Sequence, residues 1–211
     1  MASSTADSPG RPRPVFVITG TSGEGKSTLA KRLVERVPGL TLAVSATTRP
    51  RRPGEKDGRD YRFFTEEDFD AELAKGGFLE WVTLPWGEGY RSGTLWSELD
   101  RIAAEGDSPV LEIETGGALA VRDRVPAAVT IFVTAPSRNE LEKRLRSRAT
   151  ESEGEIDERL EIAEKQLALE PEFQHTIVND DLERALTELE GIIRGALAGA
   201  GTMPARDPSP H

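Results

Sequence analysis

The sequence predicts an α/β fold, in which helices cover both faces of a parallel β-sheet. Short apolar runs rich in β-branched residues alternate with segments of helical periodicity, as expected for buried parallel strands joined by crossover helices. The length of 211 residues suits one domain with a sizeable core. Residues 14–197 are expected to form this domain. Residues 1–13 and 198–211 have too little apolar content to offset chain entropy and are predicted to be disordered tails.

The first predicted elements are a strand and the helix that follows it. Residues 15–18 (VFVI) form an uninterrupted apolar run that ends at a glycine-rich turn, which is typical of a buried strand. Leu29, Leu33 and Val37 then recur at helical spacing, and Pro38-Gly39 ends the helix.

The remaining signals alternate between helices and strands. Thr65 and Asp68 have the N-cap and N3 spacing of a capping box, which predicts a helix beginning between them. Buried strands are expected at residues 110–113 (VLEI) and 129–133 (VTIFV), with a short one at 176–178 (TIV). A later helix is predicted from one apolar stripe: Ile156, Leu160, Ala163 and Leu167.

The charge of the chain limits the kinds of partner. The formal net charge is −10, from 27 basic and 37 acidic side chains, which argues against nucleic acid or an anionic membrane as the main partner. Basic residues are nevertheless concentrated in two places, at residues 49–62 and 138–148. Basic clusters in an acidic protein suit small, highly charged ligands such as nucleotides.

Several chemical classes are excluded by composition. The chain has no cysteine, so it has no disulfide, thiolate nucleophile or cysteine metal site, and its two histidines are too few for a multi-histidine zinc site. No apolar run is long enough for a signal peptide or a membrane span. We therefore expect a soluble, cytoplasmic protein.

A phosphate-binding loop follows the first strand. Residues 20–27 match G-x-x-x-x-G-K-[ST] and lie between a predicted strand and a predicted helix, as this P-loop motif requires. Its glycines allow backbone N–H groups to surround a phosphate at the positive end of the helix. Lys26 is expected to reach the β- and γ-phosphates of ATP, and the Ser27 hydroxyl to ligate Mg²⁺. The predicted ATP-binding residues here are Gly20, Thr21, Ser22, Gly23, Glu24, Gly25, Lys26, Ser27 and Thr28.

The loop alone does not distinguish a kinase from a GTPase or a motor ATPase, but other segments do. Residues 45–61 read SATTRPRRPGEKDGRDY and resemble the GMP-binding segment of guanylate kinases, S-x-T-T-R-x-P-R-x-G-E-x-x-G-x-x-Y. The resemblance continues in the family's order through FLEW at residues 78–81, RLRSR at 144–148 and IVNDDL at 177–182. It implies a P-loop NTPase-type sheet with a small GMP-binding insertion at about 45–95 and a mobile lid at about 147–160.

The resemblance also implies roles for individual residues. Arg49, Arg52 and Tyr61 would hold the GMP phosphate, as paired guanidiniums and a phenol can do with directional contacts, and Arg49 would also assist catalysis. Glu55 would orient the two arginines. Glu80 would select guanine, because a carboxylate can accept hydrogen bonds from both N1–H and the 2-amino group. The further GMP-binding residues by resemblance are Ser45, Tyr90, Ser92 and Glu114.

The chain departs from the family's pattern at several positions. Arg51 stands where the GMP-binding segment has proline, although Arg49 and Arg52 keep their spacing. Arg91 stands where the family has glycine after the tyrosine, and Glu114 and Gly116 replace an aspartate and a glutamine. The carboxylate of Glu114 keeps its charge but is displaced by one methylene, which bears on the guanine or metal–water contact at this position.

The lid is expected to supply cations for phosphoryl transfer. Arg144 and Arg148 are four residues apart on a predicted helix and so share a face, while Arg159 would approach from the other side of the lid. Closure of these arginines over the triphosphate would stabilise the transferring group and exclude water. Asn179 is expected near the adenine of ATP.

The sequence is thus interpreted as an ATP- and Mg²⁺-dependent kinase that phosphorylates GMP or dGMP and acts as a monomer or small homo-oligomer. Two alternatives remain. A non-catalytic guanylate-kinase-like interaction module is opposed by the retained Lys26 and Ser27. A P-loop kinase of another phosphorylated small molecule, such as a ribose bisphosphate, is favoured by Arg91, Glu114 and Gly116 but opposed by the segment at residues 45–61.

Overall fold

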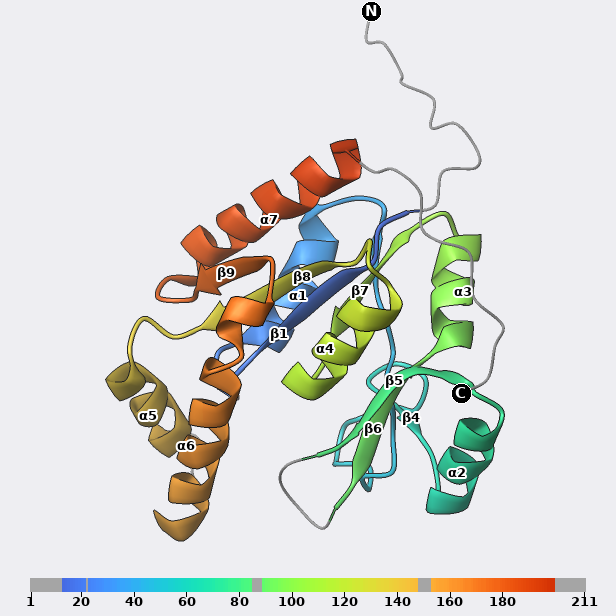
Figure 1. Cartoon of the computed structure of the whole chain (residues 1–211), viewed down its shortest axis with the longest axis horizontal. Helices are drawn as coiled ribbons and strands as arrows, with labels where there is room; N and C mark the ends of the chain where they lie inside the picture. Colours follow the sequence, from blue (N-terminus) through green and yellow to red (C-terminus); the bar gives the residue numbers. More distant parts are fainter. Residues whose placement is uncertain (1–12, 22, 85–88, 148–152, 200–211) are drawn as a thin grey trace, which may run out of the picture.

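The computed structural model describes residues 13–21, 23–84, 89–147 and 153–199. These residues form two β-sheets with helices around them (Figure 1). The strands are β1 (Phe16–Gly20), β2 (Leu40–Leu42), β3 (Ala46–Thr47), β4 (Arg62–Phe63), β5 (Phe78–Thr83), β6 (Arg91–Leu95), β7 (Ser108–Glu112), β8 (Val129–Thr134) and β9 (His175–Val178). The helices are α1 (Lys26–Arg36), α2 (Glu66–Ala74), α3 (Trp96–Ala104), α4 (Thr115–Arg124), α5 (Arg138–Ser147), α6 (Glu153–Leu167) and α7 (Leu182–Gly199), with a 3₁₀ turn at Glu170–Glu172.

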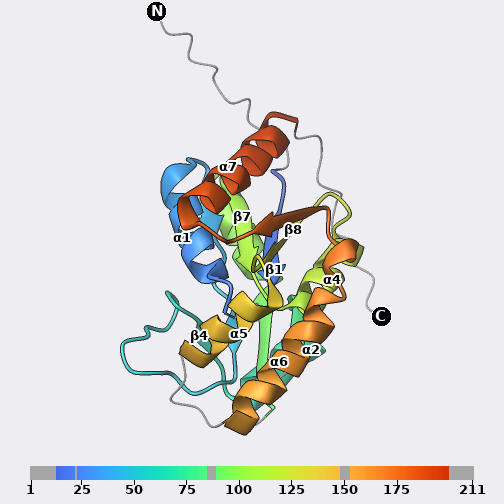
Figure 2. The same ribbon diagram turned by 90° about the vertical axis from the view of Figure 1, so that its left-hand side faces the viewer.

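The larger sheet is five-stranded and parallel, in the order β2-β7-β1-β8-β9. In Figure 2 this sheet lies between α1 on one face and α4 on the other. The expected parallel sheet with helices on both faces is therefore present. In parallel sheets of this kind, ligands bind at the carboxyl ends of the strands, where the connections to the helices begin.

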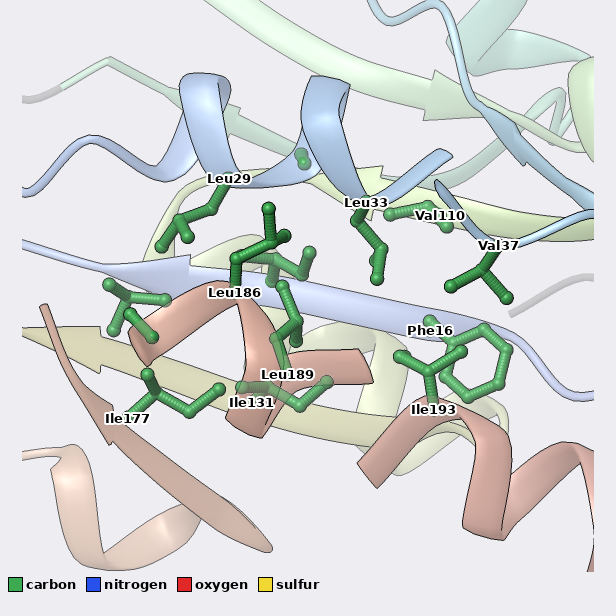
Figure 3. Close-up of a cluster of buried hydrophobic side chains, with 14 of the residues drawn as sticks. Phe16, Leu29, Leu33, Val37, Val110, Ile131, Ile177, Leu186, Leu189 and Ile193 are labelled. Carbon is green, nitrogen blue, oxygen red and sulfur yellow. The ribbon is translucent and has the colours of Figure 1, made fainter. Parts of the chain in front are cut away.

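The alternation of side chains along β1 divides the core into two layers. Phe16 and Ile18 point to one face and pack with residues of α1 and α7, as Figure 3 shows for Leu29 and Leu186 among others. Val15 and Val17 point to the opposite face and pack with residues of α3 and α4. Because both faces of β1 are buried, its first three residues, Phe16 to Ile18, are all apolar rather than alternating with polar ones.

The smaller sheet has the order β4-β3-β6-β5, with β6 antiparallel to both of its neighbours. Phe69 of α2 stacks on Phe78 of β5 with ring centroids 4.4 Å apart and anchors the helix to this sheet. The helix begins where the capping box predicts, since the Thr65 hydroxyl accepts a hydrogen bond from the Asp68 amide at 3.1 Å. The sheet and α2 form the insertion that faces the P-loop.

Most predicted core elements are confirmed. The expected strands at residues 15–18, 110–113, 129–133 and 176–178 correspond to β1, β7, β8 and β9, with ends displaced by up to two residues. The individual strands of the smaller sheet and helix α4 were not predicted. Within the described part of the chain, no helix is long and apolar enough to span a membrane.

Candidate active site

A cavity of about 380 Å³ lies where the P-loop, the carboxyl end of β7 and the smaller sheet meet. Its lining comes from segments far apart in the sequence: Gly23, Glu24, Gly25, Lys26, Ser27, Thr28, Ser45, Thr47, Arg49, Arg52, Glu55, Tyr61, Glu80, Val82, Leu84, Ser92, Glu112, Ile113, Glu114 and Arg159. Fourteen of these twenty are residues that the sequence predicted for the ATP or GMP site, and Arg159 was predicted for the lid. One cavity thus joins the two predicted sites.

The P-loop has the backbone geometry that its glycines allow. Gly25 caps α1 in the left-handed region at φ 76°, a conformation that side-chain-bearing residues rarely adopt. The Lys26 ammonium donates hydrogen bonds to the carbonyls of Gly20 at 2.9 Å and Thr21 at 2.6 Å. These contacts hold the Lys26 side chain over the P-loop, where its ammonium can reach a phosphate bound by the loop amides.

Glu112 is a functional candidate that sequence reasoning missed. The Ser27 hydroxyl donates a hydrogen bond to its Oε2 at 2.9 Å, which joins the start of α1 to the end of β7. The donated proton leaves the serine oxygen lone pairs available, and the carboxylate adds hard oxygen ligands nearby. Such a donor set fits Mg²⁺, which prefers a few protein oxygens together with phosphates and waters. The signal available in the sequence was an acidic residue at the end of a buried strand.

A second carboxylate, Glu24, is enclosed within the P-loop itself. Its side chain is fully buried, accepts a hydrogen bond from Thr21 at 3.1 Å and forms an ion pair with Arg144 at 3.1 Å. Arg144 also donates to the backbone carbonyl of Asn179 at 2.9 Å, and the Asn179 amide donates to the Glu24 carbonyl at 2.6 Å. Burial raises the pKa of Glu24, although Thr21 and Arg144 oppose this effect. Arg144, predicted as a catalytic arginine of the lid, and Asn179, predicted for the ATP site, are therefore both held at the P-loop.

The residues predicted to bind the GMP phosphate form a hydrogen-bonded cluster. Glu55 accepts from the Arg49 guanidinium at 2.8 Å and from the Arg52 amide at 2.7 Å, so it joins the two arginines as expected of an orienting residue. The hydrogen bond from Arg49 lowers the pKa of Glu55. The Arg49 guanidinium lies 5.3 Å from the centre of the Tyr61 ring. Burial raises the pKa of Tyr61, which keeps its hydroxyl protonated as a donor.

The carboxyl group of Glu80 is buried but lines the cavity, with only 2% of the residue exposed. Its Oε1 accepts a hydrogen bond from the Thr94 hydroxyl at 2.7 Å. Burial raises the pKa of Glu80 from 4.5 to about 7, while the hydrogen bonds from Thr94 limit the rise. A buried acceptor of this kind is strongly stabilised by any ligand that brings N–H donors.

Neighbouring residues on β6 face opposite ways. Ser92 lines the cavity and donates to the Ala46 carbonyl at 3.1 Å. Arg91, in contrast, points to α2, where it pairs with Asp70 at 2.6 Å and with Glu66, and lies over the Phe69 ring at 4.5 Å. Arg91 therefore gives no support to a different substrate, because its side chain is engaged outside the cavity.

Glu114 lies at the N-terminus of α4 and lines the cavity. Its Oε2 accepts a hydrogen bond from the amide of Gln166 at 2.9 Å, which connects α4 to α6. Burial raises the pKa of Glu114, and Lys26 opposes the rise. Arg159, which also lies on α6, lines the cavity. Helix α6 therefore contributes to the site through Arg159 and, by its hydrogen bond to Glu114, through Gln166.

Other predicted site residues lie elsewhere. Gly20, Thr21, Tyr90, Arg144 and Asn179 do not line the cavity, although all but Tyr90 belong to or contact the P-loop. Ser22 and Arg148 fall outside the described residues. Because Arg148 is not among the described residues, the shared face predicted for Arg144 and Arg148 remains a prediction.

Comparisons with known proteins agree over nearly the whole chain. A family model described as guanylate kinase matches residues 11–196. A guanylate kinase of Thermosynechococcus vestitus is 48% identical over 183 residues, covering 87% of this chain and 94% of that protein. One of Rubrobacter xylanophilus is 45% identical over 185 residues, covering 88% and 95%. The crystal structure of guanylate kinase from Anaplasma phagocytophilum matches with a TM-score of 0.71 at 26% identity, covering 89% of this chain and 87% of that one.

Proposed function

The chain belongs to the guanylate kinase family, and we propose that the cavity described above is where the γ-phosphate of ATP is transferred to GMP or dGMP. The enzyme is an ATP:GMP phosphotransferase, which gives ADP and GDP. One observation carries the assignment of the cavity: Lys26 of the P-loop and Glu80 of the smaller sheet line the same space. Both substrates must meet in one enclosed site for direct transfer, since an open site would favour hydrolysis.

On the donor side, the P-loop amides and Lys26 would hold the β- and γ-phosphates of ATP. Lys26 would exchange its contacts with the Gly20 and Thr21 carbonyls for phosphate oxygens, at little cost in geometry. Ser27 and Glu112 would hold Mg²⁺ at the edge of the cavity. When bound, Mg²⁺ would supply positive charge that stabilises the phosphates of ATP during transfer.

On the acceptor side, Arg49, Arg52 and Tyr61 would hold the GMP phosphate with one of its oxygens facing the γ-phosphorus. That oxygen attacks, a new P–O bond forms, and the bond to the bridging oxygen of ADP breaks. A general base is not required, because the attacking phosphate oxygen is already anionic. The arginine pair instead reduces the repulsion between two anionic phosphates.

The guanine base would be recognised by Glu80, with Ser45, Ser92 and Glu114 nearby. Ionised Glu80 can accept from guanine N1–H and the 2-amino group together, whereas adenine offers no such donor pair. AMP would leave the buried Glu80 carboxylate with its hydrogen bond from Thr94 but without the two donors that guanine brings, which is costly. The buried position of Glu80 thus favours guanine over adenine.

Closure of the lid at residues 147–160 would complete the site. Arg159 already lines the cavity, and Arg144 is held at the P-loop by Glu24. Together with Arg148, these cations would surround the transferring phosphoryl group and exclude water. A cytoplasmic location and a monomer or small homo-oligomer remain predictions from the sequence.

A coupled assay of ADP release tests the proposal. GMP, dGMP, AMP, UMP and CMP are compared at equal concentrations, with Lys26→Met as the control for contaminating ATPases. We expect kcat/KM for GMP to exceed that for AMP by several powers of ten. A preference for AMP or for a sugar phosphate, with GMP inert, would refute the assignment.

A further inference from the structure

Helix α4 comes unusually close to Glu80. The helix packs against β5, the strand that carries Glu80 (Figure 1). A Cβ atom built at Gly117 of α4 would lie 2.3 Å from Oε2 of Glu80 and 3.0 Å from its Cδ. Real Cβ atoms are not found so close to other heavy atoms. The observed position of the Glu80 carboxylate is therefore compatible only with a residue that has no side chain at position 117.

The opposite side of the carboxylate is also held. Thr94 is paired with Glu80 across the antiparallel β5–β6 ladder, and its hydroxyl donates to Oε1 at 2.7 Å. Thr94 is fully buried, so this contact does not compete with bulk water. The Glu80 carboxylate thus lies between β6 and α4 and is open only toward the cavity. Glu80 lines this cavity, whereas Gly117 does not.

We propose that Gly117 is a specificity-determining positioning residue: its missing side chain lets α4 hold the Glu80 carboxylate at the depth where it can face the guanine base. This inference rests on the proposed function, in which Glu80 reads guanine. Gly117 touches no substrate and acts through Glu80 alone.

The size of the effect follows from the distances. An ordinary contact needs about 3.4 Å or more, so a methyl group at position 117 would displace the carboxylate by about 1 Å. Displacements of that size cost on the order of 100-fold where directional contacts decide the rate. The N1–H and 2-amino groups lie side by side on guanine. A displaced carboxylate could therefore no longer accept well-aligned hydrogen bonds from both groups.

The experiment compares Gly117→Ala with Gly116→Ala, a matched control one residue earlier in the same helix. A Cβ atom at Gly116 would meet only Val82 Cγ1, at the ordinary distance of 3.5 Å. Both changes raise helix propensity to a similar degree. We expect Gly117→Ala to lower kcat/KM for GMP by about 10-fold to 100-fold, with the KM for ATP within about twofold of wild type. Gly116→Ala should stay within about twofold for both substrates.

Two further readouts exclude a merely structural role. IMP lacks the 2-amino group, so the preference for GMP over IMP should shrink in Gly117→Ala. In a Glu80→Asp background the shorter side chain makes room for the methyl group, and Gly117→Ala should then cost less than about threefold. This second comparison also applies if Gly117→Ala alone folds poorly, because the double variant relieves the clash.

The outcomes separate this inference from the proposed function. If Glu80→Gln lowers GMP turnover but Gly117→Ala behaves like Gly116→Ala, the positioning role is overturned and the guanine assignment stands. An equal loss from Gly117→Ala in the wild-type and Glu80→Asp backgrounds would also overturn it. If Glu80→Gln leaves GMP turnover intact, the guanine assignment itself fails.

Discussion

Glu80→Gln should make the protein more stable at alkaline pH while it damages GMP recognition. Glu80 is buried, and its pKa is raised from 4.5 to about 7, chiefly by that burial. Between pH 4.5 and pH 7, Glu80 is therefore mostly protonated in the folded state but mostly ionised in the unfolded state. By linkage, stability falls as pH rises from 4.5 to 7.

The magnitude follows from the same numbers. Each tenfold difference in proton affinity corresponds to about 1.4 kcal/mol, so ionising Glu80 in the folded state costs about 3 kcal/mol at pH 8. Glutamine has no proton to lose and avoids this cost. Part of this cost already applies at pH 5, so about 2.5 kcal/mol develops between pH 5 and pH 8. For a domain of this size we expect the melting temperature of Glu80→Gln, relative to wild type, to rise by about 5–10 °C over this interval.

The chain offers a matched control in Glu98, another buried glutamate. Burial raises the pKa of Glu98, but hydrogen bonds from Arg101, the Val44 amide and Arg62 outweigh it, and the pKa is lowered overall. Its ionised form therefore adds stability at neutral pH that is lost on acidification. Glu98→Gln should destabilise the protein at pH 8 by roughly 3 kcal/mol, since two cations lose their partner.

The assay is urea or thermal unfolding of wild type and both variants from pH 5 to pH 8, with steady-state kinetics on the same preparations. Glu80→Gln should also lose about 2–4 kcal/mol in kcat/KM for GMP, because an amide presents a donor to a donor. A stability difference between Glu80→Gln and wild type that does not change with pH would refute the reasoning, as would a change of the opposite sign.

Three further predictions concern the phosphate sites. Lys26→Met should lower kcat about 100-fold or more while circular dichroism stays unchanged, since a cation that acts on the transferring phosphoryl group is lost; near-normal turnover would contradict its role. Arg49→Ala should raise the KM for GMP much more than the KM for ATP. A larger rise in the KM for ATP would contradict the assignment of Arg49 to the GMP site. Glu24→Gln should raise the KM for ATP several-fold with the KM for GMP unchanged, because Arg144 loses the charge that holds it at the P-loop; equal changes in both constants would argue against this link.

The core of this fold could be predicted from the sequence because local signals and burial agree there. Strand β1 is apolar on both faces, the glycine loop follows it, and α1 repeats its apolar residues at helical spacing. The smaller sheet gave no such signal. Its strands β3 and β4 are two residues long, too short for any periodicity, and pairing with distant segments holds them in place.

The candidate site was predictable where a residue type and its spacing together define a chemical task, as at Lys26 or Arg49. The site was less predictable where the direction of a side chain decides whether it reaches the cavity. Arg91 and Ser92 are neighbours on β6, and alternation along a strand sends only one of them into the cavity. The partner of Ser27, Glu112, comes from a strand 85 residues away and is an ordinary strand-end glutamate until the fold brings them together.

The pairing of carboxylates supports the proposed position of the substrate base. Within the described residues, the buried carboxyls of Glu98 and Glu24 are paired with arginines, whereas the buried Glu80 and the half-buried Glu114 have neutral partners, Thr94 and Gln166. A fold selected for stability alone would replace an unpaired buried carboxyl by an apolar or amide side chain. Glu80 and Glu114 both line the cavity, as do Arg49 and Arg52, which we propose to bind the GMP phosphate. A guanine base would bring the N–H donors that these carboxyls lack, so binding of GMP would offset part of the free-energy cost of burying Glu80.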